Sequence, residues 1–191
     1  EIPATFPEEL RQITLENLGP GDLTARLNLS LTNWSKVAPG LKYLLVYPYG
    51  CVEQTSSGVM PLASLRRLIA SSAIPGIKLD EVDKFLNSGI NRILSMQTGS
   101  GGFSYWPGQQ DVSWWGTLYA TFALINAKQS GLDVPEDRLS KAFNYIHEKL
   151  FTKEGITDDR YNEPVWAKEM AIYSLAIGSS ITPQEFDVFF K

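Results

Sequence analysis

The sequence predicts a mainly α-helical protein in which helical hairpins stack on one another, preceded by a short β segment. Three observations support this fold class. Apolar residues recur at helical spacing from about residue 34 onward. Similar connections recur at intervals of about 50 residues, and the residues before position 34 alternate between apolar and polar side chains. The chain has 191 residues, of which 43% are hydrophobic, so it can bury a substantial core.

The alternation near the start predicts a half-buried strand. Its apolar positions are Leu23, Ala25, Leu27, Leu29 and Leu31. Ile13 and Leu15 indicate a shorter strand before it, and the run from Gly19 to Asp22 supplies the turn. Two strands alone are only marginally stable in water. We therefore assign residues 1–33 to a β segment from or next to a preceding β-domain.

Six helices are expected in residues 34–191, each marked by apolar residues on one face. The markers are, in order, Val37, Leu41, Leu44 and Leu45; the segment from Glu53 to about Ala70; Val82, Phe85, Leu86, Ile90, Ile93 and Leu94; Trp114, Leu118, Phe122 and Ile125; Leu139, Phe143, Ile146 and Leu150; and Trp166, Met170, Tyr173 and Ile177. Pro48 is expected to end the first helix, and Gly58 and Pro61 can bend the start of the second.

The connections indicate that these helices repeat as hairpins. Residues 77–81, 132–137 and 181–185 each follow a helix rich in small apolar residues, and each carries an acid or a threonine placed to cap the next helix. Two of them also have proline early in that helix. A Gly/aromatic loop at 99–107 has its counterpart at 154–161. The last residues read as the start of a further helix, so we expect the helical domain to be truncated at its C-terminus.

The single cysteine, Cys51, lies three positions before Gln54. At this spacing a thiol can displace ammonia from a side-chain amide, which gives an internal thioester, an activated acyl group. A lone cysteine is more often a small, buried and inert residue. The flanking Gly50 and Glu53 and the preceding Tyr-Pro-Tyr, which ends at Tyr49, favour the thioester instead.

The run from Tyr47 to Thr55 resembles the thioester motif of the alpha-2-macroglobulin and complement family, and looks most like that of the bacterial alpha-2-macroglobulins. The resemblance extends from about Leu41 to the end of the chain. Helical hairpins joined by a Gln-x-x-x-Gly-Gly-Phe loop, here residues 97–103, are similar to those of an α/α-toroid. The resemblance therefore implies a partial α/α-toroid that carries a thioester.

For the site, the resemblance implies a cross-link between Cys51 and Gln54. Tyr49 and Gly50 would support it as part of the motif. Glu53 would set the turn or cap the following helix, where the helix dipole favours a carboxylate.

For the function, the resemblance implies a broad-spectrum protease inhibitor that is not an enzyme. A target protease would cut a bait segment outside this chain, and a lysine amine of the protease would then attack the Gln54 acyl carbon. The expected partners are target proteases and other domains of the same large protein. The resemblance also implies a periplasmic or membrane-anchored location at the cell envelope.

Other residues are expected to have ordinary roles. His147, the only histidine, is predicted to be an ordinary surface or boundary residue, and Arg66 and Arg67 are predicted to lie on a solvated helix face. The aromatic cluster is expected to be core packing; it comprises Phe103, Tyr105, Trp106, Trp114 and Trp115. In some thioester proteins a histidine assists transfer to hydroxyls, but the matching positions, 161–163, hold none. Direct attack by amines is therefore expected.

Composition argues against several other classes. The net charge of −4 and the pI near 5.1 argue against a nucleic-acid partner. No apolar run approaches the roughly 20 residues that cross a bilayer, so we expect no direct membrane insertion by this segment. One cysteine and one histidine cannot form a zinc site, and residues 99–102 lack the lysine of a phosphate-binding loop, so no metal or cofactor is expected.

Two alternatives remain open at this point. One is an enzyme on the same toroid, similar to a prenyltransferase or cyclase, with Cys51 as a nucleophile or with a pocket in the ring. The other is a binding module in which Cys51 stays a free thiol.

Overall fold

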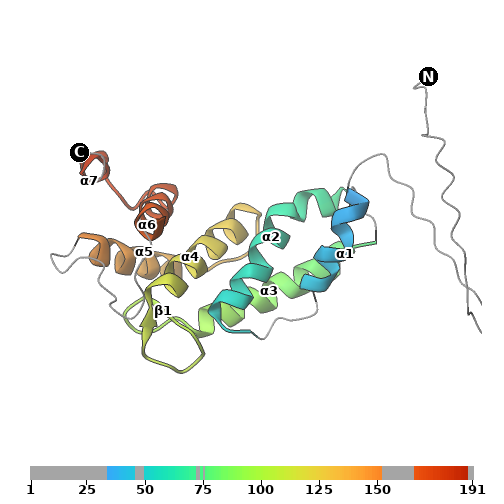
Figure 1. Cartoon of the computed structure of the whole chain (residues 1–191), viewed down its shortest axis with the longest axis horizontal. Helices are drawn as coiled ribbons and strands as arrows, with labels where there is room; N and C mark the ends of the chain where they lie inside the picture. Colours follow the sequence, from blue (N-terminus) through green and yellow to red (C-terminus); the bar gives the residue numbers. More distant parts are fainter. Residues whose placement is uncertain (1–33, 46–49, 72–73, 75, 152–165, 189–191) are drawn as a thin grey trace, which may run out of the picture.

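The computed structural model describes residues 34–45, 50–71, 74, 76–151 and 166–188. These residues form seven helices and one two-stranded antiparallel sheet (Figure 1). The helices are α1 (Trp34–Leu44), α2 (Val52–Ala70), α3 (Leu79–Ser95), α4 (Trp114–Gln129), α5 (Glu136–Phe151), α6 (Trp166–Ile177) and α7 (Pro183–Asp187), and the strands are β1 (Phe103–Ser104) and β2 (Val112–Ser113). The six predicted helices are all present, and α7 is the expected further one.

The helices stack as hairpins, as the repeated connections predict. Helix α4 packs against both α2 and α6, while α3 packs on α2 and α5 packs on α4 and α6. Figure 1 shows the resulting row, with α1 at one end and α7 at the other.

Two rows of helices differ in how they are buried. Helix α4 has buried residues around more than half of its circumference, whereas the buried residues of α5 form one narrower stripe: Leu139, Ala142, Phe143, Ile146 and Leu150. A helix that is apolar all round is one that neighbours surround, and a striped helix covers one side of a core. Helices α2, α4 and α6 pack on one another in turn, and we call them the inner row; α3 and α5, which pack against these helices, are the outer row.

The observed helix starts agree only in part with those predicted from the sequence. Thr182 caps α7 by accepting a hydrogen bond from the backbone N–H of Glu185, and Pro183 is the first helical residue, as expected. The start of α3 differs, because Lys78 occupies the cap position and Asp80 and Glu81 lie in the first turn. There they interact with the helix dipole instead of capping. Helix α2 continues through Pro61.

Arg66 is not on a solvated face, and that expectation is wrong. Its guanidinium forms two hydrogen bonds to the Asp83 carboxylate, from Nε to Oδ1 at 2.7 Å and from Nη2 to Oδ2 at 2.9 Å. The hydrogen bond to Asp83 raises the pKa of Arg66 above its ordinary value. This bidentate pair joins α2 to α3, whereas Arg67 is exposed as predicted.

The Gly/aromatic loop between α3 and α4 is tied to the next hairpin by Gln97. Its side-chain N–H₂ donates to the carbonyl oxygens of Gly101 and Arg138, both at 2.9 Å, and Arg138 Nε donates to Gln97 Oε1. Gln97 also forms an isolated antiparallel bridge with Phe103. The glutamine of the predicted loop pattern therefore fixes the loop to the start of α5.

Two of the three glycines of this loop, Gly101 and Gly102, are required by close approach of neighbouring groups. A Cβ on Gly101 would lie 2.3 Å from the carbonyl oxygen of Lys141, and Gly101 has a φ of +98°. A Cβ on Gly102 would lie 2.5 Å from Val112 Cγ1. Phe103, which follows, is fully buried. The Gly-Gly-Phe pattern thus places a buried aromatic side chain directly after two positions that have no room for a side chain.

Some sequence predictions fall on residues outside the described part of the chain. They include the β segment 1–33, the lead-in residues Tyr47 and Tyr49, and residues 161–163. Among the helices that the structure describes, none combines the length and the apolar composition needed to cross a bilayer.

We predict that Gly101→Ala destabilises the protein by about 2–4 kcal/mol, because it adds both left-handed backbone strain and a clash with α5. Urea unfolding measures the change. Gly99→Ala, in the same loop, is the control, since a Cβ there meets nothing within 4 Å. The control should change stability by no more than about 0.5 kcal/mol. Equal effects of the two substitutions would show that the loop does not pack on α5 as described.

We also predict a pH dependence from the contact between α5 and α7. Glu185 accepts hydrogen bonds from Thr182 and from His147 Nε2, the latter at 2.8 Å, and the bonds from Thr182, followed by that from His147, lower the pKa of the Glu185 carboxyl. A carboxyl group whose pKa is lowered in the folded state stabilises the fold at pH values above the ordinary pKa of glutamate. This stabilisation is lost as the pH falls through the lowered pKa.

Glu185→Gln should therefore reduce stability at neutral pH but not well below about pH 4. Urea unfolding across this pH range measures the difference from the wild type. Glu148→Gln, at an exposed position on α5, is the matched control and should show no such trend. A difference that stays constant with pH would contradict the proposed origin.

Candidate functional site

Cys51 and Gln54 occupy the N-cap and the third position of α2. Serine or threonine at the cap with glutamate or glutamine at the third position forms a capping box, in which the second side chain folds back onto the cap backbone. Here Gln54 Oε1 accepts a hydrogen bond from the backbone N–H of Cys51 at 3.2 Å. The start of a helix therefore brings a thiol and a side-chain amide into the same turn.

This turn favours acyl chemistry at Gln54. Attack of the Cys51 sulfur on Gln54 Cδ would place negative charge on Oε1, and the Cys51 N–H already donates to that atom. The positive end of the α2 dipole lies at the same place. Cys51 is half-buried and Gln54 is exposed, so both remain open to reagents in the described part of the chain.

Gly50 gives the Gln54 side chain its space. A Cβ at position 50 would lie 2.4 Å from Gln54 Cβ and 2.6 Å from Gln54 Oε1. Any other residue would push Gln54 away from Cys51 or displace the helix start. The glycine of the motif is thus explained by close approach of a side chain.

Glu53 does not cap the helix, because Gln54 does so. Glu53 Oε1 instead accepts a hydrogen bond from the Tyr105 hydroxyl at 3.1 Å, and the backbone N–H of Val52 donates to the Tyr105 carbonyl oxygen at 3.1 Å. The second bond satisfies one of the N–H groups that a helix start leaves unpaired. Tyr105 therefore fixes the first turn of α2 to the Gly/aromatic loop.

The Gly50 carbonyl oxygen also has partners. The Thr55 hydroxyl lies 3.2 Å from it and 3.0 Å from the Cys51 carbonyl oxygen, and Arg92 Nε donates to it at 3.4 Å. Thr55 is buried and Arg92 is half-buried. No sequence pattern predicted a role for either residue. Thr55 was visible only as the last residue of the motif, and Arg92 lies on the polar side of an amphipathic helix, where no pattern distinguishes it.

The aromatic cluster is only partly core. Phe103 and Trp114 are buried, Tyr105 and Trp115 are half-buried, and Trp106 is 46% exposed. The expectation of core packing is wrong for Trp106. Tyr105, as described above, contacts the thioester motif through Glu53.

His147 lies on α5, away from the motif. Its Nε2 is bonded to Glu185, and its ring lies 4.6 Å from that of Phe151. It is half-buried at the boundary between α5 and α7, which suits the ordinary role predicted for it. Helix α2, which carries Cys51, packs mainly on α3 and α4.

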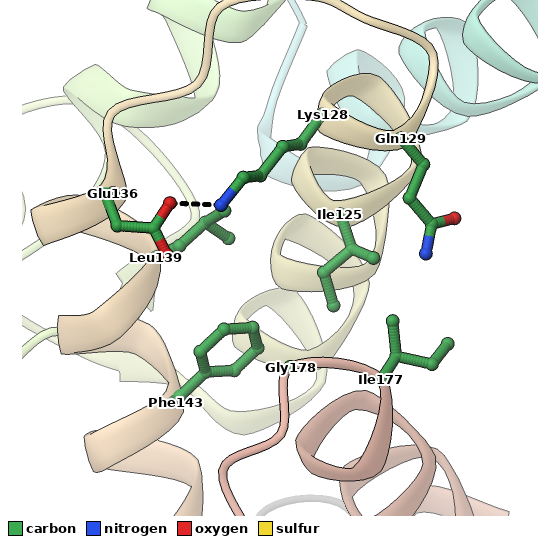
Figure 2. Close-up of a pocket in the computed structure, with 8 residues that line it drawn as sticks. All are labelled: Ile125, Lys128, Gln129, Glu136, Leu139, Phe143, Ile177 and Gly178. Atoms are coloured by element: carbon green, nitrogen blue, oxygen red, sulfur yellow. Dashed lines mark hydrogen bonds and ion pairs between the residues drawn. The ribbon is translucent and has the colours of Figure 1, made fainter.

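A cavity of ≈ 370 Å³ lies between α4, α5 and the end of α6 (Figure 2). Its lining residues are Ile125, Lys128, Gln129, Glu136, Leu139, Phe143, Ile177 and Gly178. Those on α4 come from the C-terminal half of that helix, whereas Val52, next to Cys51, approaches Gly116 in its first turn. The polar groups of the lining include an ion pair between Lys128 and Glu136. The cavity thus contains none of the motif residues.

Within the described residues, no group of three or more His, Cys, Asp or Glu side chains is placed to hold a metal ion.

The sequence matches the family model of the A-macroglobulin TED (thioester) domain over residues 26–171. The chain belongs to this family. It is 34% identical over 165 residues to the alpha-2-macroglobulin of Escherichia coli K12. The matched region makes up 85% of this chain and 10% of the relative. The bacterial thioester domain that the motif predicted is therefore confirmed.

Solved structures of alpha-2-macroglobulins also match this chain. The structure of Salmonella alpha-2-macroglobulin reacted with methylamine matches with a TM-score of 0.63 and 30% identity, over 76% of this chain and 10% of that one. Trypsin-activated alpha-2-macroglobulin from Escherichia coli matches with a TM-score of 0.58 and 26% identity, over 71% of this chain and 10% of that one. The predicted α/α-toroid class is confirmed. The chain spans about a tenth of the length of these relatives.

We predict that Gly50→Ala lowers the yield of the Cys51–Gln54 cross-link by about ten- to a hundredfold, because a displacement of about 1 Å is enough to misalign reacting groups. Mass spectrometry measures the yield as loss of one ammonia molecule. Gly40→Ala is the control, since a Cβ there meets nothing within 4 Å. An unchanged yield in Gly50→Ala would show that Gln54 does not need this space.

Proposed function

We propose that the chain is the thioester-bearing domain of a broad-spectrum protease inhibitor, which traps proteases covalently through Cys51 and Gln54. The observation that carries this proposal is the turn at the start of α2, where Gln54 Oε1 accepts a hydrogen bond from the Cys51 N–H. Membership of the thioester-domain family supports it.

The thioester forms within this turn. The Cys51 sulfur adds to Gln54 Cδ, a sulfur–carbon bond replaces the carbon–nitrogen bond, and the thiol proton leaves with ammonia. The Cys51 N–H stabilises the oxyanion on Oε1 during this step. Tyr105 holds the turn through Val52 and Glu53 while the bond forms.

Trapping is the reverse chemistry with another nucleophile. After a protease cuts a bait segment, a lysine amine attacks Gln54 Cδ, an amide forms, and Cys51 leaves as a thiolate that takes up the amine's proton. The thiolate forms at the positive end of the α2 dipole, which favours it. Each molecule acts once, so the domain inhibits proteases and is not an enzyme.

Two relatives support this chemistry. Salmonella alpha-2-macroglobulin has been obtained reacted with methylamine, a small amine, and the Escherichia coli protein has been obtained activated by trypsin, a protease. We extend both properties to this chain. The proposed partners are target proteases and the other domains of one large protein, and the proposed location is the periplasm or the cell envelope.

The thioester must be protected until it is needed. Gln54 is exposed and Cys51 is half-buried among the described residues, so these residues alone leave the bond open to water. We propose that Tyr47, Tyr49 and an adjoining domain provide the cover. The enzyme alternative gains no support from the site, since the single histidine is bonded to Glu185.

We predict that the purified chain shows one of two mass signatures at Gln54. An intact thioester lowers the mass by one ammonia molecule, and a hydrolysed one leaves glutamate in place of glutamine. Methylamine should add to the intact form. Cys51→Ala should show neither signature, because no sulfur can attack Gln54. An unmodified Gln54 in the wild type, unreactive to methylamine, would favour the binding module with a free thiol.

The same experiment tests the preferred nucleophile. With no histidine at residues 161–163, amines should react directly and glycerol poorly. Products that are mainly hydroxylamine-sensitive esters would contradict direct attack by amines.

A further inference from the structure

We propose that Arg92 is a positioning residue for the thioester chemistry, which acts through the peptide bond between Gly50 and Cys51. The inference rests on the proposed function, because it concerns how the same turn stabilises charge on Gln54. No other described contact joins a cationic side chain of α3 to the motif.

Both ends of this one peptide unit are engaged. Its oxygen, on Gly50, accepts from Arg92 Nε at 3.4 Å, and its N–H, on Cys51, donates to Gln54 Oε1 at 3.2 Å. The Thr55 hydroxyl lies 3.2 Å from the same Gly50 oxygen. The single hydroxyl proton of Thr55 is shared between this oxygen and the Cys51 carbonyl oxygen, which lies 3.0 Å away. Arg92 therefore donates to the Gly50 oxygen more consistently than Thr55 does.

A donor at the oxygen of a peptide makes its N–H a better donor, because hydrogen bonds in a chain polarise one another. A guanidinium is always charged and does so more strongly than a neutral group. The positive charge of Arg92 is therefore relayed through the peptide to Gln54 Oε1. This is the atom on which negative charge develops, both when the thioester forms and when an amine opens it.

Arg92 also orients the peptide. The first turn of α2 has to present the Cys51 N–H toward Gln54, and rotation of the peptide plane would turn it away. Two donors from different elements, Arg92 on α3 and Thr55 on α2, converge on the Gly50 oxygen and oppose this rotation. Gly50 itself is buried, so water competes weakly for its carbonyl.

A merely structural role is the alternative to be distinguished. Arg92 lies in the last turn of α3, where a cation stabilises the helix through its dipole. Such a role would change stability without changing the hydrogen bond of the Cys51 N–H. The test therefore needs a direct signal from that N–H.

The chain provides this signal because it contains one cysteine. Labelling with ¹⁵N-cysteine gives a single amide resonance, which reports the strength of the hydrogen bond from Cys51 to Gln54. The variants are Arg92→Met, Arg92→Lys and, as a matched loss of one positive charge, Arg67→Met on the exposed side of α2. Each is measured by this resonance, by circular dichroism and by the rate of methylamine incorporation at Gln54.

Arg92→Met should move the Cys51 amide proton upfield and slow methylamine incorporation by roughly two- to tenfold, less than removal of a direct oxyanion donor. Arg92→Lys should recover part of both effects, and Arg67→Met should match the wild type. If Arg92→Met does not fold, Arg92→Lys and Thr55→Val provide the test. Each should show a smaller upfield shift of the Cys51 amide proton and a smaller decrease in the rate of methylamine incorporation. Thr55→Ser, which keeps the hydroxyl, should match the wild type.

The outcomes separate the two proposals. If Arg92→Met leaves either the Cys51 amide resonance or the rate of methylamine incorporation unchanged, the role of Arg92 is overturned. The proposed function still stands in that case, provided that the wild type takes up methylamine. A wild type with neither a mass signature at Gln54 nor methylamine uptake overturns the proposed function and this inference with it.

Discussion

The hydrogen bond from the Cys51 N–H to Gln54 Oε1 is the constraint around which the site is arranged. It exists because a helix start leaves N–H groups unpaired and a side chain three residues on can reach back to them. Gly50 leaves room for that side chain, and Tyr105 holds the turn from the neighbouring loop. A common helix-capping geometry thus becomes reactive when cysteine takes the place of serine or threonine.

The helical hairpins give this turn rigid surroundings. The turn belongs to α2, in the inner row, where it packs against the first turn of α4, and the Gly/aromatic loop links it to the next hairpin. Gln97 anchors that loop to the start of α5, and Gly101 lets it lie directly on the α5 backbone. The contacts from α5 to Cys51 therefore form one continuous path through backbone groups and half-buried side chains. The cavity at the other end of α4 is separate from this path.

The hairpins and the placement of Cys51 and Gln54 in one turn were predictable because both are local patterns. Apolar periodicity fixes the faces of α3 and α5, and the spacing of Cys51 and Gln54 fits one helical turn. Long-range contacts were not predictable. The pairing of Arg66 with Asp83, the exposure of Trp106 and the bond from Arg92 to Gly50 depend on which helices become neighbours. No periodicity within a single helix carries that information.

The donors that make this turn reactive do not discriminate between nucleophiles. Any nucleophile that attacks Gln54 Cδ puts charge on Oε1, so the Cys51 N–H and the α2 dipole assist water as well as an amine. In the proposed function, selectivity for a protease must then come from access rather than from chemistry within the turn. Since the described residues leave Gln54 exposed, that control lies in whatever covers the turn. The proposed trap therefore has two separate requirements, a turn with the geometry for acyl chemistry and a removable cover, and the described residues supply the geometry of the first.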